Sequence, residues 1–152
     1  MDGDPPVMTI GYERANPPRI IAALRAAGAR SLIDVRAVPV SRKPGLSKRA
    51  LAAALEEAGL GYAHLVGLGN PKAGRDAGKA GDWATFRRIF AAHMETEAAT
   101  EALAQAAEIA AAGPVCLMCY ERAPETCHRA IVADRLADMM GKDVRHLTPD
   151  VD

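Results

Sequence analysis

The feature of this sequence that most constrains its fold is a regular alternation of short apolar runs and longer helical patterns. The apolar runs have the length and composition of buried strands and stand at 7–10, 31–35, 62–66, 115–119 and 143–147. The helical patterns, several of them opened by a capping residue or proline and closed by glycine, stand at 17–27, 47–58, 82–90, 96–112 and 124–140. This alternation predicts an α/β fold: a three-layer α/β/α domain, Rossmann-like or flavodoxin-like, around a mostly parallel sheet of about five strands. We expect the strand order 3-2-1-4-5.

The length of 152 residues suits a single domain, and two segments stand outside the alternation. Residues 1–6 are acidic and rich in proline, and we expect them to form a disordered tail. Residues 67–82 are rich in glycine and show no periodicity, which predicts a mobile loop.

Charge and cysteine content limit the classes of function. Lysine plus arginine and aspartate plus glutamate number 19 each, so bulk charge does not favour a protein wrapped in nucleic acid. No apolar run approaches the length of about 20 residues that a membrane span needs, and the N-terminal residues lack a secretory pattern. Three cysteines are too few for a disulfide scaffold and are expected to be reduced thiols. We therefore expect a cytoplasmic protein with no membrane partner, and the sequence indicates no particular oligomeric state.

Polar and titratable residues follow four of the predicted strands at the point where each strand ends. They are Gly11 and Tyr12, Asp34 and Arg36, His64, and Cys119 and Glu121. In parallel α/β sheets, ligands bind beyond the carboxyl ends of the strands, near a switch point in strand order. The sequence therefore predicts one shared site at this edge.

The segment with the strongest chemical signal is CYERAPETCHR, from Cys119 to Arg129, which leaves an apolar strand and enters an amphipathic helix. A helix N-terminus presents backbone N–H groups and a positive dipole end, which favour anions and lower the pKa of a nearby thiol. Cys127, His128 and Arg129 stand there, so the segment is typical of an anion cradle with a nucleophile. The alternative is structural: Cys119 and Cys127 pack in the core, and Arg129 pairs with Glu121 or Glu125.

This segment admits three sharper interpretations. The phosphatase spacing of cysteine and arginine is missing, because the sixth residue after Cys119 is Glu125. A redox pair would normally be C-x-x-C, whereas seven residues separate Cys119 from Cys127, although a folded-back loop could still close a disulfide. Zinc binding by Cys119, Cys127, His128 and His64 would need two adjacent ligands and lacks the paired C-x-x-C spacing. We therefore assign no metal ligand and no cofactor from the sequence. A metal-binding or thiol-redox protein that uses Cys119, Cys127 and His128 stays as the third functional hypothesis.

A second stretch, from Arg36 to Arg49, contains five basic residues and no acidic one. Asp34 is placed to orient Arg36, while Ser41 and Arg42 lie in the loop that follows. The stretch is typical of phosphate or polyanion binding, and solvated loop charge is the alternative. A nucleic-acid-binding module that uses this loop is the second functional hypothesis, with the cysteine segment then purely structural.

These motifs together resemble an uncharacterised family, the domain of unknown function numbered 488. The shared motifs stand here as Thr9-Ile10-Gly11-Tyr12, Asp34 to Arg42, Tyr62-Ala63-His64-Leu65, and Cys119 to Arg129. The resemblance implies that these positions form a common site, without supplying an activity. Two departures are Leu46, where the family often has an aromatic residue, and the absence of the usual Pro-Glu-Leu-Gly-Gly after His64.

The leading hypothesis is an enzyme that acts on a small anionic or phosphorylated substrate, such as a nucleotide. Cys127 or Cys119 would be the nucleophile or redox thiol, and His64 or His128 the acid or base. Glu121 and Asp34 would orient these groups. The residues expected at the anion are Gly11, Tyr12, Arg36, Ser41, Arg42 and Arg129.

Overall fold

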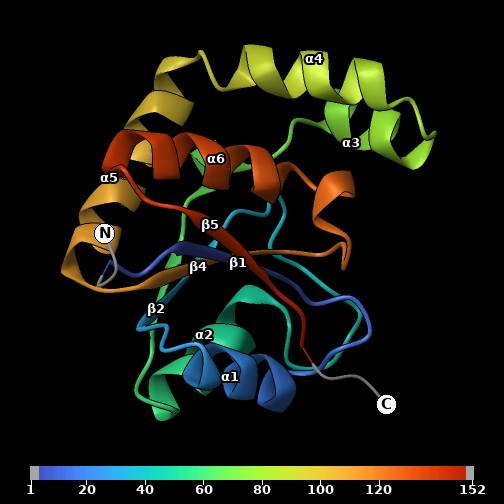
Figure 1. Ribbon diagram of the computed structural model, residues 1–152. Helices are drawn as coiled ribbons and strands as arrows, with labels where there is room; N and C mark the ends of the chain where they lie inside the picture. Colours follow the sequence, from blue (N-terminus) through green and yellow to red (C-terminus); the bar gives the residue numbers. More distant parts are fainter. Residues whose placement is uncertain (1–3, 150–152) are drawn as a thin grey trace.

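The structure is a computed structural model that describes residues 4–149 (Figure 1). Five parallel strands form one sheet in the order β3-β2-β4-β1-β5. The strands are β1 (Val7–Gly11), β2 (Ser31–Asp34), β3 (Gly61–His64), β4 (Val115–Cys119) and β5 (Val144–Leu147). The predicted α/β class and parallel sheet are confirmed. Residues 4–6 of the predicted tail have no regular structure, and the first three lie outside the described range.

Helices cover both faces of the sheet, as the three-layer prediction requires. They are α1 (Pro17–Ala26), α2 (Lys48–Glu57), α3 (Lys72–Lys79), α4 (Trp83–His93), α5 (Glu97–Ala112) and α6 (His128–Met140), with 3-10 turns η1 (Val66–Leu68) and η2 (Pro124–Thr126). Figure 1 shows α1 and α2 below the sheet and α6 and the α3–α4 pair above it, while α5 runs down the left side. The alanines of α5 share the core on the α6 face. None of the helices within residues 4–149 combines the length and apolar character that crossing a bilayer requires.

Each face of the sheet has its own apolar core. On the α1–α2 face, Ile20, Leu24, Leu51 and Leu55 pack against the sheet and are fully or almost fully buried. On the other face, the core includes Phe90 of α4, a row of alanines from α5 and the apolar side of α6. Small side chains let α5 approach η1 closely: a Cβ atom on Gly67 would lie 2.9 Å from Cβ of Ala102.

Local sequence signals begin the helices where expected. The side chain of Asn16 accepts a hydrogen bond from the backbone N–H of Arg19 and caps α1, and two prolines open that helix. Thr96 caps α5 in the same way through the N–H of Ala99. At the other end of the chain, Gly141 ends α6 in the left-handed conformation, at φ 64°.

The predicted strand order is wrong in one exchange: β4, not β1, occupies the centre of the sheet. Both strands are buried along their whole length, so burial alone does not separate the two orders. The observed order aligns Gly11 with Cys119 on one side of β4 and Asp34 with Met118 on the other. Strand β4 therefore ends at Cys119, between the carboxyl ends of β1 and β2.

The prediction of an irregular loop over 67–82 is also wrong, because this segment contains η1 and α3. Three of its glycines, Gly67, Gly69 and Gly74, serve close packing. A Cβ atom on Gly74 would lie 2.1 Å from Oδ1 of Asn70, and Gly74 and Ala77 are buried. Helix α3 packs against α4 as a pair (Figure 1).

Candidate functional site

Three reactive side chains meet where β4 ends and α6 begins. Nδ1 of His128 lies 3.8 Å from Sγ of Cys119 and 3.9 Å from Sγ of Cys127. All three side chains are buried, and their potential ligand atoms lie within 4.8 Å of one another. We call these residues the cysteine–histidine cluster.

The orientation of His128 is set by its other ring nitrogen. Nε2 donates a hydrogen bond to the backbone carbonyl of Val35 at 2.7 Å, just beyond the end of β2. The ring of Phe90 packs edge-on against the imidazole, with ring centroids 5.1 Å apart. The imidazole is thus held with Nδ1 toward the two sulfur atoms.

The electrostatics of the cluster favour a charged thiolate on Cys127. Burial raises the pKa of Cys127, but hydrogen bonds with Cys119 and His128 outweigh it and hold that pKa well below the ordinary value. The hydrogen bond with Cys127 and burial raise the pKa of Cys119. Burial lowers the pKa of His128, yet its contact with Cys127 shifts it upward overall. The negative charge therefore concentrates on Cys127, with Cys119 and His128 as donors.

Glu121 lies beside this cluster, two residues after the end of β4. Burial, followed by the charge of Cys127, raises the pKa of Glu121 to about 7. A carboxyl group with that pKa can hold or release a proton near neutral pH.

The turn from Cys119 to Cys127 is held by a buried arginine. Arg129 is 0 % exposed; its Nη1 donates to the carbonyl of Glu121 and its Nη2 to the carbonyl of Arg122 at 3.3 Å. Its Nε has no hydrogen-bond partner among the described residues. Arg129 was expected at the anion, and the structure places it inside the turn, where it shapes the site from behind.

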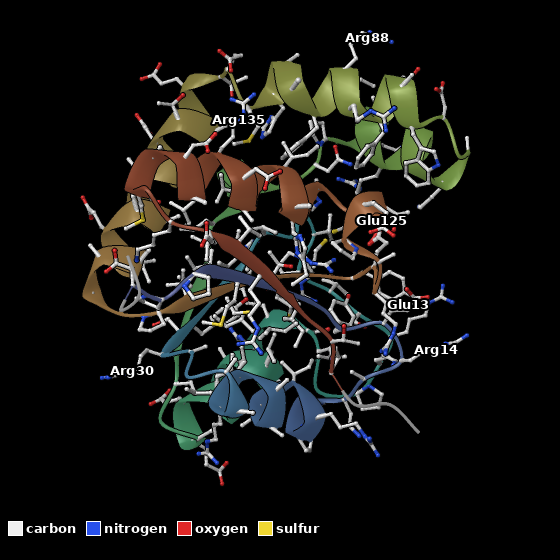
Figure 2. The ribbon with its side chains drawn as sticks, viewed as in Figure 1. Glu13, Arg14, Arg30, Arg88, Glu125 and Arg135 are labelled. Atoms are coloured by element: carbon white, nitrogen blue, oxygen red, sulfur yellow. The ribbon has the colours of Figure 1, made fainter. Side chains whose placement is uncertain are left out.

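Gly11 lets β1 approach the same turn closely. A Cβ atom on Gly11 would lie 1.8 Å from the carbonyl oxygen of Glu121, so no other residue fits without moving the backbone. On the outer side, Oε1 of Glu13 accepts a hydrogen bond from the N–H of Arg122 at 3.0 Å. Figure 2 shows Glu13, Arg14 and Glu125 at this edge of the molecule.

A buried ion pair lies next to the cluster, at the end of β2. Arg36 Nη2 lies 2.7 Å from Asp34 Oδ2, Arg36 Nε donates to Oδ1 at 2.9 Å, and both side chains are almost fully buried. Tyr62 donates to Asp34 Oδ2 at 2.6 Å, and Arg36 donates to the carbonyl of Leu46 at 2.7 Å. The Arg36 guanidinium also lies 5.3 Å from the centre of the Tyr12 ring. The predicted role of Asp34 in orienting Arg36 agrees with this arrangement.

A cleft of about 480 Å³ opens between this edge of the sheet and the α3–α4 pair. The sheet-edge side is lined by Tyr12, Arg36, Ala37, Val38, Cys119, Tyr120, Glu121, Thr126 and His128. The helical side is lined by Asn70, Arg75, Gly78, Lys79, Trp83 and Phe86. Two members of the cysteine–histidine cluster therefore face a cleft that also contains the cations of Arg36, Arg75 and Lys79.

Seven of the predicted site residues are not among those that line this cleft. Gly11, Asp34, Cys127 and Arg129 contact lining residues from behind, and the other three are His64, Ser41 and Arg42. Nε2 of His64 donates to the carbonyl of Arg36 at 2.8 Å, and its Nδ1 lies 3.5 Å from Nζ of Lys48. Ser41 exchanges hydrogen bonds with Ser47 and so shapes its own loop. Arg42 is exposed on that loop.

The helical side of the cleft was missed by sequence reasoning. Trp83 and Phe86 recur at helical spacing, which is typical of core residues, while Asn70, Arg75 and Lys79 fall in the segment predicted as a loop. The available signal was the combination of cations and aromatic residues within a short stretch. Asn70 is buried, and its Oδ1 has no hydrogen-bond partner among the described residues.

Fold and site together define an α/β protein whose cysteine–histidine cluster opens into a cleft with basic and aromatic walls. The chain belongs to the family described as domain of unknown function DUF488, whose sequence model matches residues 16–136. The resemblance inferred from the motifs is thereby confirmed. Comparisons with curated proteins and with solved structures gave no significant match.

Proposed function

We propose that this protein is an enzyme that binds a small anionic substrate with a flat apolar part, such as a nucleotide, in the cleft. The observation that carries the proposal is the meeting of Cys119 and His128 with the cations of α3 across one cleft. A volume of about 480 Å³ is within the usual range for small-molecule sites. The sequence-based expectation of a cytoplasmic protein fits this proposal and stays a prediction.

The anionic group would be held by Arg75 and Lys79. Both come from α3 and line the cleft. Arg75 donates one hydrogen bond, from Nη1 to the carbonyl of Asn70 at 2.8 Å, whereas Arg36 is committed through three nitrogen atoms to Asp34 and the carbonyl of Leu46. Arginine and lysine are the usual partners of phosphate and carboxylate groups. Arg36 contributes positive charge to the wall without giving up its own partners.

The flat part of the substrate would lie against the aromatic wall. Trp83 and Phe86 contribute from α4 and Tyr120 from the turn, and stacking on such rings stabilises a planar group. Asn70 lines the same wall, with its Oδ1 packed against Gly74 of α3.

The reacting groups would come from the sheet edge. Cys119 and His128 reach the cleft, with Cys127 directly behind them, and Glu121 is placed to take or give a proton. These roles follow the predicted assignment for Cys119, Cys127 and His128. Glu121 was expected to orient these groups and is given proton transfer here, while His64 is left to position the loop after β2.

Binding can be measured through Trp83, the one tryptophan of the chain, because it lines the cleft. We expect its fluorescence to change saturably when a nucleoside monophosphate is added to the metal-free protein. Arg75→Gln and Lys79→Gln should each weaken the affinity about 10-fold, since a hydrogen bond to a charged group contributes about 1.5–3 kcal/mol. Arg88→Gln is the control, because Arg88 points away from the body of the protein on α4 (Figure 2).

Two results of this fluorescence titration would contradict the proposal. Equal affinity in the Arg75, Lys79 and Arg88 variants would remove the anion site from the cleft. No fluorescence change with nucleotides, sugar phosphates or inorganic phosphate would remove the substrate class altogether.

The nucleic-acid hypothesis gains no comparable support. Within the stretch from Arg36 to Arg49, Arg36 is buried against Asp34, and Nζ of Lys43 donates to the carbonyl of Ala15 at 3.0 Å. The cations that remain exposed belong to Arg42, Lys48 and Arg49.

A further inference from the structure

The cysteine–histidine cluster has the composition of a metal site, and this goes beyond the proposed function, which names no cofactor. Two thiol sulfur atoms and one imidazole nitrogen converge from the end of β4 and the start of α6. Thiolate and imidazole are the donors that bind zinc, and two cysteines with one histidine are a known catalytic set.

The distances within the cluster are close to those of a tetrahedral site. Zinc bonds of about 2.3 Å to sulfur and about 2.0–2.1 Å to nitrogen place neighbouring ligand atoms roughly 3.5–3.8 Å apart. The observed separations of 3.8 and 3.9 Å between Nδ1 and the two sulfur atoms need only small movements.

The surroundings of His128 match those of a metal-binding histidine. Such a histidine generally donates its second ring N–H to a carbonyl or carboxylate, which fixes the tautomer and the direction of the lone pair. Here Nε2 donates to the carbonyl of Val35 at 2.7 Å. Nδ1 therefore points toward Cys119 and Cys127, and zinc binding would displace the proton that Nδ1 donates to Cys127.

The sequence argument against adjacent ligands does not hold for this backbone. Cys127 has an extended conformation (φ −130°, ψ 139°), and His128 is the first residue of α6. This change of conformation between neighbours brings Sγ of Cys127 and Nδ1 of His128 to the same side. The fourth ligand considered from sequence, His64, is bound to the carbonyl of Arg36 and does not join the cluster.

We propose that Cys119, Cys127 and His128 bind one Zn²⁺ ion, with a fourth coordination position open to the cleft. Structural zinc sites use four protein ligands, and the cluster found within residues 4–149 supplies three. Cys119 and His128 line the cleft, so the open position faces the substrate. The ion would act there as a Lewis acid, holding a water molecule or an anionic oxygen of the substrate.

The proposal is tested by adding zinc alone to reduced, chelator-stripped full-length protein, in competition with a chromophoric chelator. We expect one Zn²⁺ per chain, and Co²⁺ in its place should give the absorption bands of a thiolate-bound tetrahedral ion. Removing a residue that only contacts a metal ligand lowers metal affinity about 10–100-fold. Cys119→Ser, Cys127→Ser and His128→Gln each remove a ligand, so each should lower zinc affinity by more than about 100-fold. Cys116→Ala is the matched control, because Cys116 lies in the core on the α1–α2 face and should keep full zinc binding.

Thiol labelling of the wild-type protein keeps the test independent of variant folding. Zinc should protect Cys119 and Cys127 from alkylation, mapped by mass spectrometry. Zinc binding that persists in all three ligand variants, or a stripped wild-type protein that binds no zinc, would overturn the proposal. A Cys119–Cys127 disulfide in place of zinc binding would overturn it too. Nucleotide binding in metal-free protein is measured separately through Trp83, so failure of the metal site and failure of the anion site give different results.

Discussion

Asp34→Ala should destabilise the protein by about 3–5 kcal/mol, because it leaves a buried arginine without its counter-ion. Arg36 is 4 % exposed, and Asp34 accepts its Nε and Nη2 hydrogen bonds as well as that of the Tyr62 hydroxyl. The Arg36 side chain is almost fully buried, so its donors would lose Asp34 without gaining water, whereas Tyr62 is only partly buried. Urea unfolding followed by circular dichroism measures the change in the free energy of unfolding.

The matched control is Asp76→Ala, which breaks an ion pair of the same chemical type on the surface. Lys72 and Asp76 lie 2.9 Å apart on α3, but their side chains are 80 % and 55 % exposed. Exposed pairs contribute little, since solvent screens them, so the control should behave as an ordinary surface substitution. Equal losses of unfolding free energy in the two variants would show that the Asp34–Arg36 ion pair does not stabilise the end of β2.

Gly11→Ala is expected to have the second large effect, and for a steric reason. The added Cβ atom would lie 1.8 Å from the carbonyl oxygen of Glu121, which is backbone and cannot rotate away. The end of β1 and the turn after β4 would have to separate. We expect a loss of stability at or above the upper end of the roughly 1–3 kcal/mol typical of an overpacked core. Zinc affinity should fall as well, because the same turn connects Cys119 to Cys127.

Gly78→Ala makes the same chemical change where there is room for it. The nearest atom to its added Cβ is Cδ1 of Phe86 at 3.4 Å, an ordinary contact, and Gly78 lies within α3. Alanine is favoured over glycine in helices by about 1 kcal/mol, so this variant should be neutral or slightly more stable. A Gly11→Ala protein as stable as Gly78→Ala would contradict the close approach of β1 to the turn.

Much of the fold follows from local signals in the chain. The apolar runs and the capping residues are short-range features, so the strands and most helices could be predicted from sequence. Strand order depends on which of two fully buried strands is central, and β1 and β4 carry the same burial signal. Helix α3 was missed because Gly74 and Gly78 weaken its local propensity, and packing against α4 outweighs that loss.

In the candidate site too, local motifs could be predicted from the sequence, whereas groupings that depend on tertiary packing could not. Cys119, Cys127 and His128 belong to one short motif, and their grouping could be predicted because strand and helix meet there. The role of Arg129 could not, since its burial behind the turn depends on the backbone path between Glu121 and Arg122. The helical side of the cleft, with Lys79 and Trp83, is brought to the sheet edge by tertiary packing alone.

The central claim is that one cleft at the carboxyl edge of the sheet binds an anion in front of Cys119 and His128. A crystal structure of the protein grown with a nucleoside monophosphate tests this claim most directly. We predict electron density for the ligand in the cleft, with its phosphate within hydrogen-bonding distance of Arg75 or Lys79. Density for the nucleotide on another face, with both of these side chains turned to solvent, would contradict the account.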